Sequence, residues 1–302
     1  MKDKDIVEIV QFTDPVCTWC WGSEPLLRKL ETRFGDQLKV KFIMGGLVKD
    51  IRDFYDGFND IGGDAEHSNR QIAKHWLEAS ARHGMPVQSE GFNLFSNENP
   101  SSYPQSIAYK AAQMESDELA DKFLRRIREA TETEARQTNR LEVLIELATE
   151  VGLDVAKFIE RYTDGSAEKA FMEDLQLVVR YGVRGFPTFL VKYGEKEVLM
   201  RGYQNYEAIK SVIKAVSADK VKEYSSEKSI GNVMTFIQKY GKVAPVEIQE
   251  AFAYTSVEME ALVKDLQEKK MISVIPAGNG LLLEEKKQGL FCDEETGVCK
   301  MN

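Results

Sequence analysis

Two cysteines separated by two residues follow the first strongly hydrophobic run of the chain. The run is Ile6–Phe12, and the cysteines lie in the sequence Cys17-Thr18-Trp19-Cys20. The run predicts a buried strand, and the residues after the cysteines have the spacing of a helix. Cysteines at such a strand-to-helix turn can close and reopen a disulfide. The sequence therefore points first to thiol-disulfide chemistry.

The positions of these cysteines predict different roles for their sulfurs. Disulfide exchange needs an attacking thiolate, a second thiol that releases the mixed disulfide, and access for one sulfur only. We expect Cys17 at the N-terminus of the helix, where free backbone N–H groups and the helix dipole stabilise a thiolate. We expect Cys20 one turn further in and partly covered. Cys17 is thus the predicted nucleophile, Cys20 the resolving thiol, and Trp19 a substrate contact.

A proline late in the chain supports the same chemistry. Pro187 stands at the end of the run Gly182–Pro187, directly before a sequence typical of a strand. A cis peptide bond there would expose the backbone of Phe186 beside the cysteines, where an extended substrate segment can pair with it. A trans proline that merely begins a strand is the alternative. Because a Cys-X-X-Cys lies upstream, we predict the cis form, with Phe186 as a second substrate contact.

Other interpretations of the cysteines are core thiols or half of a metal site. Cys292 and Cys299 are separated by six residues, so they lack the tight spacing of a second zinc-binding pair. They form either a second redox pair or two unconnected thiols, and both alternatives stay open. The histidines recur every eight residues and cannot reach one metal from a straight helix, so we predict packing roles for them. We predict no metal and no cofactor.

Composition excludes several classes of function. The 302 residues are 43% hydrophobic, carry a formal net charge of -9 and include four cysteines. The charge gives no case for nucleic acid or an anionic membrane as a partner. No apolar segment approaches the length of a membrane span, and the cysteines are too few for a disulfide scaffold. The N-terminus Met1–Asp5 carries no secretory signal, so we predict a cytoplasmic protein.

Hydrophobic patterning predicts a thioredoxin fold, of the α/β class, with a long helical insertion. The strand at 5–13, the helix at 17–34 and the strand at 38–44 form a βαβ start. A hairpin of strands at 188–192 and 197–201, followed by a helix at 205–217, completes the unit. Between these parts, the segment 65–181 contains only helix candidates, at 69–83, 104–115, 117–131, 139–151, 154–162 and 166–181.

The rest of the chain predicts a second unit. We place a thioredoxin domain at 1–217, a polar linker after it, a small α+β module resembling a winged helix at 229–285, and a tail at 286–302. Residues 221–302 contain ten Lys, no Arg and thirteen Asp plus Glu, a poor composition for binding DNA. We therefore expect the module to make protein contacts or a homodimer. Its predicted elements are helices at 229–240, 245–253 and 256–270 and strands at 272–275 and 281–284.

The two motifs together resemble the DsbA family of thioredoxin-like proteins, and within it the cytoplasmic FrnE-like branch. The matching segments are Phe12–Trp21 and Gly182–Phe189. The inserted segment, notably Tyr109–Gln113, is also similar to DsbA-like adaptors of the SpxH type, which present a redox-regulated transcription factor to the ClpXP protease. The resemblance implies a cis Pro187. Kappa-class glutathione transferases and hydroxychromene carboxylate isomerases generally have serine in place of Cys17, so the intact pair argues against their chemistry.

Two hypotheses of function follow. The first is a thiol-disulfide oxidoreductase or isomerase that acts on protein or low-molecular-weight disulfides. The second is a redox-responsive adaptor that holds a client protein through the insertion and the C-terminal module. The uncharged Thr18-Trp19 spacer and the bulky Phe186 depart from the common family pattern, so the direction of exchange does not follow from the resemblance.

Overall fold

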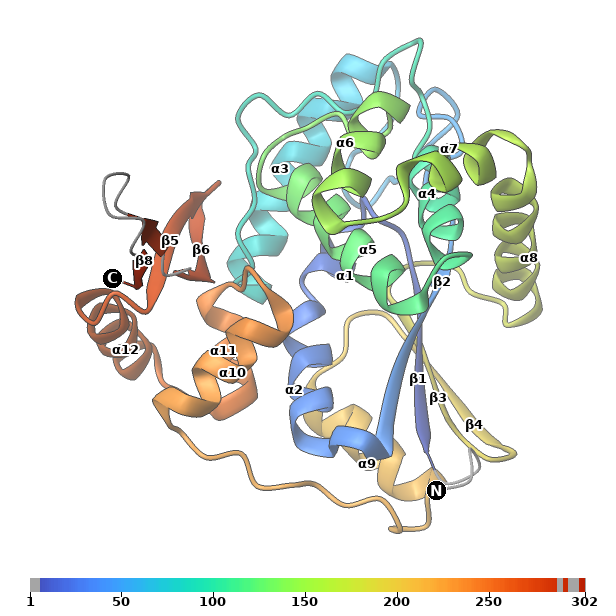
Figure 1. Cartoon of the computed structure of the whole chain (residues 1–302). Coiled ribbons are helices and arrows are strands. Elements are labelled where there is room, and N and C mark those ends of the chain that lie inside the picture. The colour runs from blue at the N-terminus through green and yellow to red at the C-terminus, as the bar shows by residue number, and fades with distance from the viewer. Residues whose placement is uncertain (1–5, 287–289, 293–298, 302) are drawn as a thin grey trace.

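A four-stranded sheet forms the centre of the molecule in this computed structural model, which describes residues 6–286, and the backbone alone for 290–292 and 299–301 (Figure 1). The strand order is β2-β1-β3-β4. β1 pairs in parallel with β2 and antiparallel to β3, and β3 pairs antiparallel to β4. The bounds are β1 Val7–Thr13, β2 Leu38–Met44, β3 Thr188–Tyr193 and β4 Lys196–Arg201. This is the predicted thioredoxin-like sheet.

Side-chain alternation along β1 places helices on both faces of the sheet. Val7 and Ile9 point to one face, where they pack with α2 (Glu24–Phe34) and α9 (Tyr206–Val216). Val10 and Phe12 point to the other face and pack with residues of α8 (Ser166–Arg180). The strand is therefore buried on both sides, and its C-terminal end carries the cysteine motif.

The helix predicted at 17–34 is two helices. α1 spans Thr18–Trp21, and α2 starts again at Glu24. Proline at position 25 has no N–H to donate to the carbonyl of Trp21, so the hydrogen-bond ladder stops there. The cysteine motif thus lies on a short helix of four residues, with a turn between it and α2.

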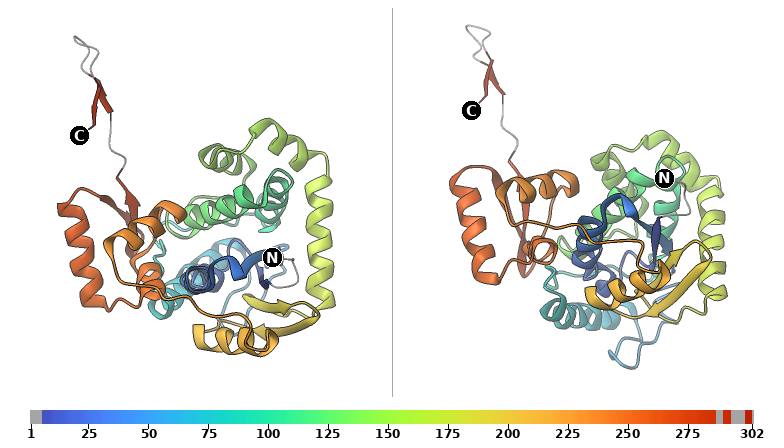
Figure 2. Two further views of the ribbon diagram at one scale, coloured as in Figure 1. Left: turned by 60° about the horizontal axis from the view of Figure 1, so that its bottom comes forward. Right: turned by 90° about the horizontal axis from the view of Figure 1, so that it is seen from below.

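The predicted helical insertion is present between β2 and β3, and its helices α4 to α8 pack against one another (Figures 1 and 2). Side-chain caps explain several helix starts, such as Asp64 on the N–H of His67 and Ser116 on the N–H of Leu119. α3 begins four residues earlier than the predicted residue 69 because Asp64 caps it. The bounds are α3 Ala65–His83, α4 Tyr103–Gln113, α5 Asp117–Glu132, α6 Leu141–Val151, α7 Val155–Thr163 and α8 Ser166–Arg180.

The C-terminal segment contains the predicted three helices and hairpin around a hydrophobic cluster of its own. It lies on the opposite side of the molecule from α8 (Figures 1 and 2). A short 3-10 helix, η2 Gly35–Gln37, follows α2, and the last two short strands place Cys292 opposite Cys299 in the backbone register. The bounds are α10 Ile230–Tyr240, α11 Pro245–Phe252, α12 Ser256–Glu268, β5 Ile272–Ala277, β6 Gly280–Glu285, β7 Leu290–Cys292 and β8 Cys299–Met301.

The module packs against both the thioredoxin unit and the insertion. α11 contacts α2, and the β5–β6 turn docks on the segment after α3. There the Asn279 N–H donates to the Val87 carbonyl at 2.9 Å, and the Val87 N–H donates to Asn279 Oδ1 at 2.9 Å. Gly278 has a positive φ of 52°, and a Cβ on it would lie 2.1 Å from the Val87 carbonyl oxygen, so this close approach requires glycine.

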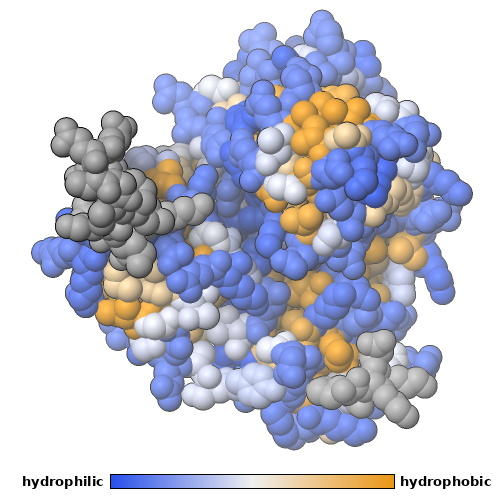
Figure 3. Space-filling model, viewed as in Figure 1, coloured by the Kyte–Doolittle hydropathy of each residue, from blue (hydrophilic) through white to orange (hydrophobic). Residues whose placement is uncertain are grey.

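The surface is mainly hydrophilic in the view of Figure 3, with hydrophobic residues gathered in patches over the inserted helices. Within residues 6–286, no helix is both long and apolar enough to cross a membrane.

Candidate active site

The two cysteines take the places predicted for them at the N-terminus of α1. Cys17 is the N-cap residue, and its Sγ accepts a hydrogen bond from the Cys20 N–H at 3.2 Å. Both residues are free thiols, with 6% of Cys17 and 0% of Cys20 exposed. The more accessible sulfur is therefore that of Cys17, although only a small part of it reaches the surface.

The pKa values of the two thiols differ from the expectation. Burial raises the pKa of the Cys17 thiol well above its usual value, and the neighbouring Cys20 and Asp14 raise it further. Burial also acts against the Cys20 thiolate, but the hydrogen bond with the Cys17 thiol and the charge of Arg128 outweigh it, so the pKa of Cys20 is lowered. The predicted donor at the helix N-terminus is present, because the Cys20 N–H bonds to Cys17 Sγ and lowers the pKa of that thiol. Burial of Cys17 outweighs this stabilisation.

A buried carboxylate beneath the motif was not predicted from the sequence. Asp14 accepts hydrogen bonds from the Val16 N–H at 3.0 Å, the Leu47 N–H at 2.7 Å and the Ser102 hydroxyl at 3.2 Å. Burial raises its pKa to about 6. Asp14 therefore ties the cysteine turn to the loop after β2 and to the start of α4. An acidic residue between the strand and the first cysteine was the only sequence signal for it.

Helix α5 of the insertion supplies charged groups behind Cys20. Arg128 is fully buried, forms an ion pair with Glu24, and donates to Thr13 Oγ1 at 2.5 Å. Glu132, also fully buried, finds no hydrogen-bond partner for its carboxyl oxygens among the described residues. Burial raises the pKa of Glu132 well above its usual value, and the charge of Cys20 raises it further. The insertion thus contributes charged groups to the surroundings of the Cys20 thiol.

The predicted cis peptide bond is confirmed between Phe186 and Pro187. Thr188 follows in β3, opposite Phe12 of β1, so the proline lies at the same end of the sheet as Cys17. The Phe186 ring packs over Gly45, where a Cβ would lie only 2.0 Å from Phe186 Cζ. Glycine at position 45 is therefore what gives the ring its place beside the cysteine motif.

Trp19 lies in a cluster of aromatic and basic side chains. Its ring centre is 5.4 Å from that of Tyr203, 5.8 Å from that of His83 and 6.3 Å from that of His75. His83 is buried, its Nδ1 accepts the Met85 N–H at 3.1 Å, and burial lowers its pKa to about 4. The histidines His75 and His83 thus pack against Trp19. Within residues 6–286 no cluster of side chains could hold a metal ion.

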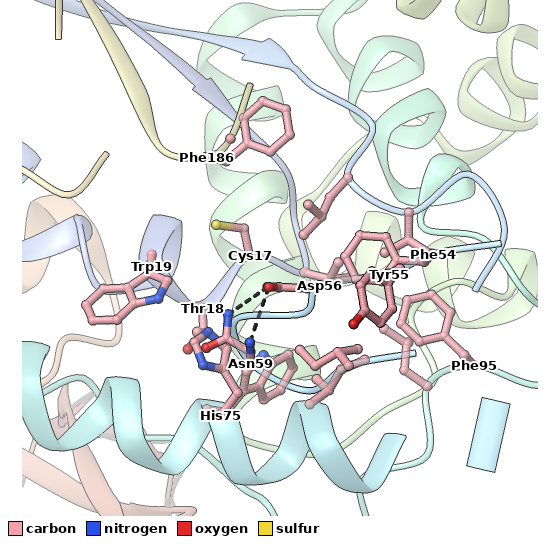
Figure 4. Close-up of a pocket in the computed structure, with 18 of the residues that line it drawn as sticks. Cys17, Thr18, Trp19, Phe54, Tyr55, Asp56, Asn59, His75, Phe95 and Phe186 are labelled. Carbon is pink, nitrogen blue, oxygen red and sulfur yellow. Dashed lines mark hydrogen bonds between the residues drawn. The ribbon is translucent and has the colours of Figure 1, made fainter. Parts of the chain in front are cut away.

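A cavity of about 510 Å³ opens beside Cys17 and was not predicted from the sequence (Figure 4). Figure 4 shows Cys17 between Phe186, Trp19 and the loop that carries Tyr55. The walls are mainly apolar and come from the loop after β2, from α3, and from the segment before α4. The apolar walls include Val48, Phe54, Ile61, Ile72, Trp76, Phe92, Leu94 and Phe95. Of the predicted site residues, Cys17, Trp19 and Phe186 all line this cavity.

A Cys-X-X-Cys at the first strand-to-helix turn, with a cis proline at the same end of the neighbouring strand in a four-stranded sheet, defines a thioredoxin-like protein. The chain belongs to the thioredoxin family, whose sequence model matches residues 10–211. Solved structures show the same fold. A Nitrosomonas europaea protein provisionally named a protein disulfide isomerase gives a TM-score of 0.58 at 22% identity, covering 70% of this chain and 97% of that one. The cytosolic disulfide reductase DsbM from Pseudomonas aeruginosa gives 0.51 at 22% identity, covering 70% and 95%.

Sequence relatives extend over more of the chain. The ClpXP adapter protein SpxH of Halalkalibacterium halodurans is 27% identical over 285 residues, which cover 92% of this chain and 89% of that protein. SpxH of Bacillus subtilis is 24% identical over 296 residues, covering 96% and 92%. The chain is therefore similar along nearly its whole length to proteins named as adaptors.

Proposed function

We propose that this protein exchanges disulfides with protein or low-molecular-weight substrates through Cys17 and Cys20. The observation that carries the proposal is the pair of free thiols at the N-terminus of α1, with the less buried Cys17 next to a cavity and to the cis Phe186-Pro187 bond. Exchange requires two thiols of unequal access and no other group. Trp19 and Phe186 line the same cavity and contact the substrate in this proposal.

The proposed steps start from the lowered pKa of the Cys20 thiol beside Cys17. As a substrate disulfide approaches, Cys17 passes its proton to the Cys20 thiolate. The Cys17 thiolate then attacks one substrate sulfur, the substrate S–S bond breaks, and the other substrate sulfur leaves as a thiolate that takes a proton from solvent. Cys20 then releases its proton to solvent, helped by the charge of Arg128, and attacks the Cys17 sulfur. The mixed disulfide breaks, and the second substrate sulfur leaves as a thiolate that takes a proton from solvent. The protein is left with a Cys17–Cys20 disulfide and the substrate with two thiols.

The reverse sequence oxidises a substrate dithiol, and the same groups serve both directions. A low pKa of Cys20 stabilises the reduced protein, in which the pair carries a thiolate. The disulfide form is therefore a stronger oxidant than it would be if Cys20 had an ordinary pKa. The name of the cytosolic reductase DsbM supports a cytoplasmic site of action. Both predicted alternatives for Cys292 and Cys299, a second redox pair or two unconnected thiols, stay predictions, since the side chains lie outside what the structure describes.

An adaptor function is the second candidate. It is favoured by the share of this chain that the alignments with adaptors cover. The oxidoreductase structures cover 70% of this chain, whereas the SpxH relatives cover at least 92%, so they necessarily include most of the C-terminal module. A module shared with adaptors and docked against the thioredoxin unit supports binding of a client protein. In this proposal the cysteines make client binding depend on the redox state.

Trapping of mixed disulfides distinguishes disulfide exchange from the adaptor function. The Cys20→Ser variant retains the attacking thiol but cannot release a mixed disulfide, so mass spectrometry of its covalent complexes should identify Cys17 and the substrate. The Cys17→Ser variant is the matched control and should trap nothing. Reduction of insulin by the wild-type protein but not by Cys17→Ser supports exchange. No turnover by the wild type, together with a client that still binds Cys17→Ser/Cys20→Ser, would leave the adaptor function.

A further inference from the structure

The loop between β2 and α3 contains an ordered turn that carries aromatic residues beside Cys17. We name residues 54–62 the aromatic turn. Asp56 and Ile61 pair as an antiparallel bridge, with N···O distances of 2.8 and 3.0 Å. The Asp56 carboxylate also accepts the N–H groups of Phe58 at 3.1 Å and Asn59 at 3.3 Å and the Asn59 side-chain amide at 2.6 Å. The turn is thus held by its own hydrogen bonds (Figure 4).

This turn presents large apolar side chains to solvent. Phe58 is 96% exposed and Tyr55 is 80% exposed. The Tyr55 ring lies across two glycines, because a Cβ on Gly57 would be 2.9 Å from its hydroxyl and a Cβ on Gly62 would be 3.0 Å from its Cδ2. One side of the ring is therefore supported by the turn while the other stays open. Neighbouring exposed aromatic residues on a fixed turn are typical of a binding surface.

The aromatic turn is continuous with the cavity at Cys17. Phe54, Tyr55 and Ile61 of the turn line the cavity together with Cys17 and with apolar residues of the insertion such as Trp76. An extended chain advances about 3.3 Å per residue. A polypeptide held through its own sulfur at Cys17 therefore places the side chains next to that sulfur in the cavity and the following ones on the turn.

The charges around the turn define the partner further. Residues 49–66 contain six Asp or Glu and two Lys or Arg, and one of these basic residues, Arg52, pairs with Asp50. Asp53 and Asp60 are exposed. Glu66, in contrast, pairs with Arg70, and Arg184, outside the turn, also lines the cavity. A segment that docks here meets apolar walls inside and a negative rim outside, so lysine or arginine at its ends is favoured.

We propose that the aromatic turn and the adjoining cavity bind an extended polypeptide segment in which large apolar residues, and then lysine or arginine, flank the cysteine that Cys17 attacks. This inference rests on the proposed exchange function and names the substrate class of the same site. It also assigns Tyr55 and Phe58 as residues that select the substrate. The acidic tripeptide glutathione lacks both features, so it is a poorer ligand for this surface.

Binding without chemistry provides the first test. The Cys17→Ser/Cys20→Ser protein is titrated into a fluorescently labelled peptide of the pattern Lys-Leu-Phe-Ser-Phe-Leu-Lys, in which serine replaces the reactive cysteine. Tyr55→Ser/Phe58→Ser should weaken binding at least tenfold by fluorescence anisotropy. Val179→Ser, which removes an 80% exposed apolar side chain on α8, should leave it unchanged. Glu in place of Lys in the peptide should also weaken binding tenfold. Equal binding by the turn variant, or no binding by the parent, overturns the inference.

Exchange kinetics separate this inference from the proposed function. The wild-type protein should prefer a disulfide of the cysteine-containing peptide over hydroxyethyl disulfide, and the turn variant should lose that preference at least tenfold. Turnover of both substrates with the preference unchanged in the variant overturns the inference and leaves exchange intact. If the wild type turns over neither substrate but the serine peptide still binds at the turn, exchange fails while the docking surface stands.

Discussion

Arg125 of the insertion and Glu247 of the C-terminal module form a two-pronged ion pair in the interior of the protein. Arg125 Nη1 lies 3.0 Å from Glu247 Oε1, and Nη2 lies 2.8 Å from Oε2. Their side chains are 7% and 0% exposed. The Arg125 guanidinium also lies 4.4 Å from the centre of the Trp21 ring, on the short helix that carries Cys20. Arg125 therefore links two parts of the protein. It pairs with Glu247 of the C-terminal module and contacts the Trp21 ring on the helix of the candidate active site.

Removal of that charge should loosen the module. Glu247→Gln keeps the size of the side chain and removes one of three carboxylates around Arg125, which still pairs with Glu129 and Glu24. Because those two carboxylates remain, we expect a cost below the roughly 3 to 5 kcal/mol of an orphaned buried charge. We expect a lower free energy of unfolding in urea and faster proteolytic cleavage in the linker at 218–228.

Glu250→Gln is the matched control, because Glu250 belongs to the same helix and pairs with Lys29 near the surface. An exposed pair of this kind contributes about 1 kcal/mol or less. Equal loss of stability in the two variants would show that the buried pair does not hold the module.

Asp14→Asn should make Cys17 more reactive at neutral pH. The negative charge of Asp14 raises the pKa of the Cys17 thiol, and Asp14 itself ionises with a pKa of about 6. Above pH 6 the wild-type carboxylate disfavours the Cys17 thiolate, and the variant lacks this effect. Below pH 6 the wild-type carboxyl is protonated, so the difference should shrink. The measurement is the rate of Cys17 alkylation by iodoacetamide against pH, followed by mass spectrometry.

The exposed Asp60→Asn is the control for a change of net charge alone. Superimposable rate profiles for wild type and Asp14→Asn would contradict a role of Asp14 in setting the reactivity of Cys17. A shift of the same size in Asp60→Asn would assign the effect to the general charge of the protein.

The sequence predicted the parts of the site that depend on local patterns. The strand before Cys17, the helical insertion and the cis bond at Pro187 all follow from hydrophobic periodicity and from motifs of a few residues. The break between α1 and α2 was missed although Pro25 signals it. The helix pattern on both sides concealed the lost hydrogen bond.

Contacts between distant segments could not be predicted in the same way. Arg125 and Glu247 are 122 residues apart, and nothing near either one indicates the other. The raised pKa of Cys17 depends on how much of the insertion covers the motif, which no local pattern reports. The cavity likewise is lined by several segments that are far apart in the sequence. Its apolar residues therefore cannot be distinguished from ordinary core residues in the sequence alone.

Gly45→Ala should displace Phe186. The added Cβ would lie 2.0 Å from Phe186 Cζ, so the ring must move away from its place beside the cavity. Overpacking of this kind costs about 1 to 3 kcal/mol, and we expect slower exchange with the peptide disulfide. Gly185→Ala is the control, since a Cβ there meets nothing within 4 Å. If Gly45→Ala and Gly185→Ala have the same stability and exchange rate, the position of Phe186 does not govern access to Cys17.

The buried His83 should lower the free energy of unfolding of the protein in mild acid. Burial lowers its pKa from 6.5 to about 4, because the ring is covered and its Nδ1 already accepts the Met85 N–H. As the pH falls below 6.5, the unfolded chain takes up a proton on this histidine while the folded protein does not, so the folded state loses stability until about pH 4. Between pH 7.5 and pH 5 this linkage costs about 2 kcal/mol.

The measurement is the free energy of unfolding at both pH values for the wild type and for His83→Asn, whose carbonyl retains an acceptor without a titrating ring. The wild type should lose about 2 kcal/mol more than His83→Asn on going to pH 5. His67→Asn, at the start of the same helix, is the matched control for the loss of an imidazole. An equal change in pH dependence for both variants would contradict a specific role of the buried ring beside Trp19.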